Sequence, residues 1–139
     1  MKANVEKRIG LAVLGVFVGL YGLPVYAGYV SKPGVYMYDK IVNGAGVYYA
    51  EGSMVGARDS ADSQQYIGCY SFRLATGGPA VKCVAQDFTG RYLFCTGYDS
   101  KWAEPVKAMT SSSFVQFASA STNGNCLRLH VENNSRYLR

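Results

Sequence analysis

The sequence predicts a mainly β protein, a small antiparallel sheet or barrel with one short helix and two disulfides. Three apolar, β-prone runs at 65–74, 80–87 and 91–97 are separated by Thr76-Gly77-Gly78-Pro79 and Phe88-Thr89-Gly90. Strand runs broken by glycine-containing turns at this spacing indicate a three-strand antiparallel meander. This stretch also holds three of the four cysteines, and the rest of the chain is expected to build on it.

The first 27 residues have the features of a secretory signal peptide. After a basic start, an uncharged apolar run at 9–23 is shorter than the roughly 20 residues that a membrane span needs. Pro24 ends any helix, and Val25-Tyr26-Ala27 places small residues at the −3 and −1 positions. We therefore expect cleavage before Gly28 and export to the periplasm or out of the cell. The alternative is an uncleaved N-terminal anchor helix.

The charge of the mature chain is modest. Removing residues 1–27 leaves 112 of the 139 residues, with 11 basic and eight acidic side chains and a net charge of +3. The charges are dispersed, with acids between the basic residues, which is typical of a solvated surface, whereas a nucleic-acid footprint is denser. We expect no nucleic-acid partner, and contact with a membrane only through the signal segment. The sequence leaves the oligomeric state open.

The four cysteines, Cys69, Cys83, Cys95 and Cys126, all follow the export signal. An even count in a small exported domain favours two disulfides. Spacings of 13, 11 and 30 intervening residues, without a C-x-x-C pair and with one histidine in the chain, fit zinc poorly. We therefore predict two disulfides and no metal site. Spacing leaves the pairing open, because the middle strand of the meander has a cysteine neighbour on each side.

We expect the mature chain to consist of a Tyr- and Gly-rich segment at 28–63 and a disulfide-bonded β domain at 64–139. In the first segment, short strands at 35–38 and 46–50 flank an Asn43-Gly44 turn and carry clustered tyrosines. A tyrosine offers apolar area and a polar hydroxyl, so such a cluster suits sugar or protein binding. The alternative is ordinary sheet tyrosines that half cover a small core. The candidate binding residues are Tyr36, Tyr38, Tyr48, Tyr49 and Trp102.

Two stretches between the predicted strands lack the alternation that is typical of a strand. The polar stretch at 54–63 is expected to be a loop, and its aspartates lack the glycine and the terminal glutamate of a calcium loop. The stretch at 99–110 is the one helix expected in the mature chain, kept short by Pro105. Trp102, Val106 and Met109 recur at helical spacing and would face the sheet. Trp102 either stacks on a ligand or packs on the core.

Alternation along the strands predicts which side chains share a face. In the last strand, at 126–132, alternation is cleanest, and an Asn-Gly turn joins it to a strand at 113–120. In the first strand of the meander one face holds Tyr66, Tyr70, Phe72 and Leu74, and the other holds Ile67, Cys69, Ser71 and Arg73.

Arg128, His130 and Glu132 share one face of the last strand and are the nearest group to a catalytic cluster. A histidine beside a carboxylate can act as a general base. Such neighbours commonly form a plain charge ladder, and the chain has no G-x-S-x-G, P-loop, Rossmann glycine or H-E-x-x-H motif. We expect no catalytic residue, no cofactor and no enzyme activity. A small hydrolase that depends on His130 is the least favoured alternative.

The element order β-β-β-α-β-β over 64–132 resembles that of the OB-fold, a five-stranded barrel that binds oligonucleotides and oligosaccharides. In that barrel the third and fifth strands are neighbours, so the resemblance implies the pairs Cys69–Cys83 and Cys95–Cys126. The chain is also similar, over about residues 55–137, to small exported bacterial proteins with no assigned activity, and this similarity brings no functional residues. The residues that carry it are Tyr66-Ile67-Gly68-Cys69, Cys83, Gly90, Cys95 and Gly124-Asn125-Cys126.

These features together predict an exported, non-catalytic binding or envelope protein. The expected ligand is a glycan, a peptidoglycan fragment or another protein. The alternatives are an inhibitor of a periplasmic enzyme, or a structural subunit that self-assembles through the strands at 29–49.

Overall fold

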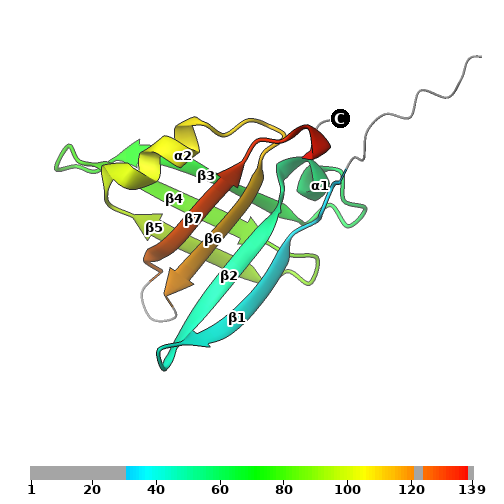
Figure 1. The fold of residues 1–139 in the computed structure, drawn as a ribbon, viewed down its shortest axis with the longest axis horizontal. Helices are drawn as coiled ribbons and strands as arrows, with labels where there is room; N and C mark the ends of the chain where they lie inside the picture. Colours follow the sequence, from blue (N-terminus) through cyan, green and yellow to red (C-terminus); the bar gives the residue numbers. More distant parts are fainter. Residues whose placement is uncertain (1–30, 121–123, 138–139) are drawn as a thin grey trace, which may run out of the picture.

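The computed structural model describes residues 31–120 and 124–137, and the signal-peptide prediction for residues 1–27 lies outside them. The strands of this region form two antiparallel sheets. The first contains, in order, β1 (Tyr36–Val42), β2 (Ala45–Ser53), β6 (Phe114–Ala120) and β7 (Cys126–Glu132). The second contains β3 (Tyr66–Arg73), β4 (Pro79–Gln86) and β5 (Tyr92–Gly97). Figure 1 shows the sheets packed face to face, with the strands of one running across those of the other.

The mainly β, antiparallel fold is confirmed, and the predicted meander is the three-stranded sheet. The strands do not close into a barrel in the described region, because β6 pairs with β2 and leaves β5 at the edge of the second sheet. The Tyr- and Gly-rich segment at 28–63 supplies β1 and β2. These strands therefore share one sheet with the C-terminal hairpin of the region 64–139.

The core lies between the two sheets. Phe117 of β6 is completely buried at its centre, with Ala50 beside it on β2 in register. The second sheet contributes Val81 and the cysteine row of β4 and β5 to the same cluster. Because each sheet buries one face, the opposite face of each remains uncovered by the other sheet.

The helical segments close the ends of the sandwich rather than covering a sheet. The predicted helix is a 3₁₀ turn, η1 (Ser100–Trp102), followed by α2 (Ala103–Lys107), and α2 contacts β3, β4 and β7. A second 3₁₀ turn, η2 (Ser135–Tyr137), follows β7. Among the described residues no helix is long and apolar enough to cross a membrane.

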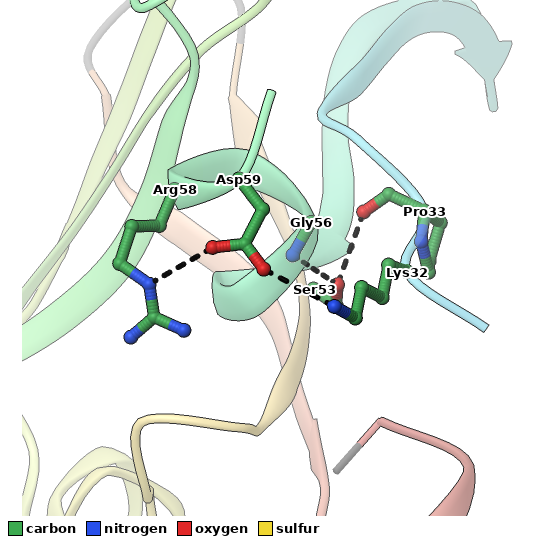
Figure 2. Close-up of polar contacts among 6 residues, drawn as sticks. All are labelled: Lys32, Pro33, Ser53, Gly56, Arg58 and Asp59. Atoms are coloured by element: carbon green, nitrogen blue, oxygen red, sulfur yellow. Dashed lines mark hydrogen bonds and ion pairs between the residues drawn. The ribbon is translucent and has the colours of Figure 1, made fainter. Parts of the chain in front are cut away.

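The stretch at 54–63, expected to be a loop, begins with a helical turn, α1 (Met54–Arg58). The buried Ser53 hydroxyl accepts a hydrogen bond from the Gly56 N–H at 2.8 Å, which is a standard N-cap. The same hydroxyl donates to the Pro33 carbonyl at 3.2 Å, and the Ser53 N–H donates to that carbonyl at 3.0 Å. Figure 2 shows how these bonds hold residues 32–33 against α1, with Lys32 paired to Asp59 at 3.2 Å.

This N-terminal strap, residues 31–35, lies so close to α1 that a side chain at Gly56 would not fit. A Cβ atom built there would lie 2.3 Å from the Pro33 carbonyl oxygen. At its start, the Ser31 N–H donates to the Arg136 carbonyl at 2.7 Å. The strap therefore links α1 to the C-terminal turn η2.

Both disulfides have the predicted partners. Cys69–Cys83 joins neighbouring strands of the three-stranded sheet, and Cys95–Cys126 joins β5 to β7. The reason for the second pair differs from the expected barrel neighbourhood. β5 and β7 belong to different sheets and meet where the sheets pack, with an isolated parallel bridge between Thr96 and Asn125. Two disulfides indicate an oxidising environment.

Candidate binding surface

The outer face of the three-stranded sheet carries the largest gathering of exposed aromatic side chains in the described chain. Register places alternate residues of β3, β4 and β5 on this face. Five of them are aromatic and between 37% and 51% exposed. These five define the aromatic face: Tyr66, Tyr70, Phe72, Tyr92 and Phe94.

The aromatic residues lie on the two outer strands, and the central strand β4 presents no aromatic side chain on this face. On β3, the Tyr70 and Phe72 ring centroids are 6.0 Å apart, and on β5 the Tyr92 and Phe94 centroids are 5.9 Å apart. Between these pairs, β4 presents Lys82, Val84 and Gln86. The Lys82 Nζ atom lies 4.8 Å from the Phe94 centroid, within cation–π distance.

The aromatic face stands on a rigid base. Cys69, Cys83 and Cys95 form one row on the opposite side of the same three strands. Cys83 and Cys95 are completely buried, and both disulfides start from this row. Because the strands are crosslinked to each other and to β7, the backbone that carries the rings is fixed before any ligand arrives, which lowers the entropy cost of binding.

A cleft of about 320 Å³ lies beside the aromatic face, between the β1–β2 hairpin and the start of β5. Apolar and tyrosine side chains line most of it, and Tyr92 belongs to both the cleft and the aromatic face. The cleft and the face are therefore adjoining parts of one surface. The cleft is lined by Met37, Tyr48, Tyr49, Arg91, Tyr92 and Leu93.

The turn that precedes β5 is fixed by Asp87. This buried carboxylate accepts hydrogen bonds from the Thr89 hydroxyl at 2.6 Å, the Thr89 N–H at 2.9 Å and the Arg91 N–H at 3.1 Å. Burial alone would raise the pKa of Asp87, but the hydrogen bonds and the Arg91 charge outweigh it and lower the pKa below its ordinary value. Asp87 is thus a charged anchor that orients Arg91 and Tyr92.

The candidate binding tyrosines of the N-terminal segment lie on two different faces of the four-stranded sheet. Tyr38 and Tyr49 stack at 5.0 Å on its outer face, and Tyr36, 64% exposed, lies on the same face. Tyr48 alternates to the other side of the strand, and both Tyr48 and Tyr49 line the cleft at the edge of the hairpin. Alternation therefore separates residues that are close in sequence.

The stacked Tyr38–Tyr49 pair belongs to a local polar network. The Tyr38 hydroxyl donates to Glu51 at 3.3 Å, and Lys40 lies 5.3 Å from the Tyr38 centroid. Burial, and then the Glu51 carboxylate, raise the pKa of Tyr38, so the phenol stays a neutral donor. Gln116 donates to the same carboxylate, which ties β1, β2 and β6 together.

Trp102 packs into the molecule instead of joining either tyrosine group. It is half-buried against the core cluster. Its ring lies against Gly97 so closely that a Cβ atom there would be 2.4 Å from the indole Cδ1 atom. Of its two expected roles, the contacts are those of core packing.

Arg128, His130 and Glu132 lie on the outer face of the four-stranded sheet, where His130 is opposite Gln116. The Glu132 carboxylate accepts hydrogen bonds from Arg136 at 2.7 Å and from Asn134 at 3.0 Å. Arg136, then Asn134, lower the pKa of Glu132. Within residues 31–120 and 124–137, no three His, Cys, Asp or Glu side chains gather into a metal-binding group.

The sequence contained part of the signal for the aromatic face. Alternation already placed Tyr66, Tyr70 and Phe72 on one face of their strand, and the same rule places Tyr92 and Phe94 together on β5. Their relation across β4 depends on register, which turns and packing set. Arg91 and the cleft gave no separate sequence signal, because the cleft forms between strands far apart in the chain.

Comparisons with known proteins identify no relative of this chain. No family model matches the chain, and no curated protein and no solved structure shows a significant match.

Proposed function

We propose that this protein is an exported, non-catalytic glycan-binding protein and that the aromatic face is its binding surface. The observation that supports this most is five partly exposed rings on one face of a crosslinked sheet. A contiguous exposed apolar patch with a polar surround is characteristic of an interaction site.

The chemistry of the face suits sugar rings. The C–H face of a pyranose is apolar and packs on an aromatic ring, while its hydroxyls need hydrogen-bonding partners at the ring edge. The tyrosine hydroxyls of β3 and β5, with Gln86 and Thr96, offer such partners on the same face. The face therefore combines apolar area with dispersed polar groups, which a purely apolar protein interface does not require.

A binding screen with purified oligosaccharides tests the proposal. The panel includes chito-oligosaccharides, peptidoglycan fragments, xylo-oligosaccharides and uronic-acid oligosaccharides, with affinities measured by calorimetry. Tyr70→Ala and Phe94→Ala each remove one ring from opposite sides of β4. Each is expected to weaken binding about tenfold, the loss of roughly 1.5 kcal/mol of ring burial.

Tyr36→Ala is the matched comparison. Tyr36 is also an exposed strand tyrosine, but it lies on the outer face of the other sheet. Unchanged affinity in Tyr36→Ala, with weaker binding in the other two variants, supports the aromatic face. Loss of binding in Tyr36→Ala alone would move the site to the tyrosines predicted from the N-terminal segment.

An exposed surface can also serve self-association. Pairing of two copies through the edge strand β1 is disfavoured by the residues of that strand. Ile41 is 74% exposed near the end of β1, but Asp39 and Lys40 occupy the middle of the strand. Charged residues on an edge strand discourage pairing with another copy. Sedimentation analysis of the purified protein checks this, and a stable dimer abolished by Phe94→Ala would replace glycan binding with self-assembly.

A further inference from the structure

We propose that the glycan is acidic and that it follows a strip along β5 from Lys82 to Arg91. This inference rests on the proposed glycan-binding function and specifies its ligand class. The strip consists of Lys82 over the Phe94 ring, the neighbouring Tyr92 ring, and Arg91, which lines the cleft that Tyr92 shares.

Lys82 marks one end of the strip. It is the only charged residue among those of β3, β4 and β5 that share the outer face. Its register partners on that face are Tyr70 and Thr96, and its ammonium group lies over the Phe94 ring. No carboxylate of the described residues lies within ion-pair distance of Lys82. A ligand stacked on Phe94 therefore meets a cation that the protein does not neutralise.

Arg91 marks the other end. Its side chain lines the cleft beside Tyr92, with Met37 and Leu93 as apolar neighbours. Arg91 interacts with the charge of Asp87, but that carboxylate is buried and already accepts three hydrogen bonds. Arg91 can thus present its guanidinium group to a ligand carboxylate, for which its planar set of donors is well suited.

The two aromatic rings between the cations form a continuous path. Phe94 and Tyr92 have an interplanar angle of 29° and lie two residues apart on the same side of β5. Residues at this spacing are about 6.8 Å apart along a strand. Sugar rings stacked here would bring carboxylates on flanking residues toward Lys82 and Arg91.

The sparse positive charge favours a carboxylated glycan over a nucleic acid. A single strand of nucleic acid carries a phosphate at every nucleotide and is bound in a groove with many cations. The strip has one cation at each end and two rings between them. This pattern matches a glycan of which two carboxylates, on sugars that flank the stacked rings, are paired with a cation.

The test compares acidic oligosaccharides with their methyl esters, which keep the rings and remove the charge. The probes are oligogalacturonate, oligomannuronate and hyaluronan fragments, each with its ester, and oligothymidylate is the nucleic-acid probe. We expect acidic forms to bind more tightly than esters, and more weakly at high salt. Lys82→Gln and Arg91→Gln should each weaken acidic binding about two- to fivefold, as for an exposed ion pair, and weaken ester binding by a smaller factor. Lys107→Gln, an exposed cation on α2, is the matched control.

The outcomes separate this inference from the proposed function. Equal binding of acid and ester, with no effect of Lys82→Gln or Arg91→Gln, overturns the acidic ligand and leaves glycan binding in place. Binding of none of these probes, nor of the neutral oligosaccharides, overturns both. Tighter binding of oligothymidylate than of any glycan assigns the strip to nucleic acid instead.

Discussion

Cys83 and Cys95 lie directly opposite each other on β4 and β5, yet each is bonded to a different cysteine. Cys83 has a second opposite neighbour, Cys69, at a Cα–Cα distance of 4.0 Å, which is typical of the narrow type of antiparallel pair. In an antiparallel sheet, a residue of a central strand forms a narrow pair with the residue opposite it on one neighbouring strand and a wide pair with the residue opposite it on the other. Cys83 and Cys95 therefore form the wide pair. Cys95 is therefore bonded to Cys126 of β7, and this second disulfide joins the two sheets.

The two disulfides should contribute unequally to stability. Cys69–Cys83 closes a loop with a sequence separation of 14, whereas Cys95–Cys126 spans 31 and joins the sheets. Chain entropy alone gives about 3 kcal/mol for the shorter loop and about 4 kcal/mol for the longer. We expect Cys95→Ala/Cys126→Ala to have a lower melting temperature than Cys69→Ala/Cys83→Ala. Calorimetry of both double variants checks the order, and the reverse order would contradict it.

Replacement of Gly56 should destabilise the protein through the N-terminal strap. A Cβ atom in Gly56→Ala would collide with the Pro33 carbonyl and displace the strap, at a cost of about 1–3 kcal/mol. Urea unfolding measures the loss. Gly78→Ala is the control, because its nearest neighbour would be 3.8 Å from the new Cβ atom, and a change within about 0.5 kcal/mol is expected. Similar losses in both variants would argue against the close contact at Gly56.

Asp87 should make stability depend on pH in the acid range. Its pKa is lower in the folded protein than in the unfolded chain, so its contribution is complete above the unfolded value of about 4 and is lost as pH falls through the folded value. Asp87→Asn should cost about 1–3 kcal/mol at pH 6, because three hydrogen bonds lose their charged acceptor.

Melting temperatures of the wild type and Asp87→Asn between pH 6 and pH 2 test this. The difference between them should narrow below about pH 4. Other acids also titrate there, but they are common to both proteins. A difference that stays constant down to pH 2 would show that the Asp87 charge does not support the turn.

Trp102 should report on the core and not on the ligand. Trp102→Ala is expected to lower stability by about 3 kcal/mol and to leave glycan affinity unchanged, because the ring packs on Gly97 inside the molecule. It is the only tryptophan, so its fluorescence follows unfolding of the whole domain. A large fluorescence change on addition of a bound oligosaccharide would instead place Trp102 at the site.

Local patterns account for the elements that the sequence predicted well. Alternation and glycine turns identified β3, β4 and β5, and they also placed Tyr66, Tyr70 and Phe72 on one face. The split into two sheets had no local signal, because the pairing of β2 with β6 joins residues such as Glu51 and Gln116, 65 positions apart. That pairing is decided by the burial of Phe117 and its neighbours between the sheets.

The candidate site was predictable only in part for the same reason. The tyrosines of the N-terminal segment are neighbours in sequence, but β1 and β2 send them to opposite faces of a sheet. The aromatic face joins residues from β3 and β5, and their proximity follows from a register that also depends on the disulfides. The helical turn α1 was missed because the stretch is short and rich in polar residues, and the contacts that Ser53 makes with the strap are long-range.

The hydrogen bond between Ser31 and Arg136 has a consequence for the connectivity of the chain. It brings Ser31 and Arg136, which lie at the two ends of the region that the structure describes, together at one place on the surface. A short peptide joining residue 31 to residue 137 could therefore close this region into a ring without disturbing either sheet. New termini could then open at the Asn43-Gly44 turn, where both residues are exposed, giving a circular permutant with the same strands in a different chain order.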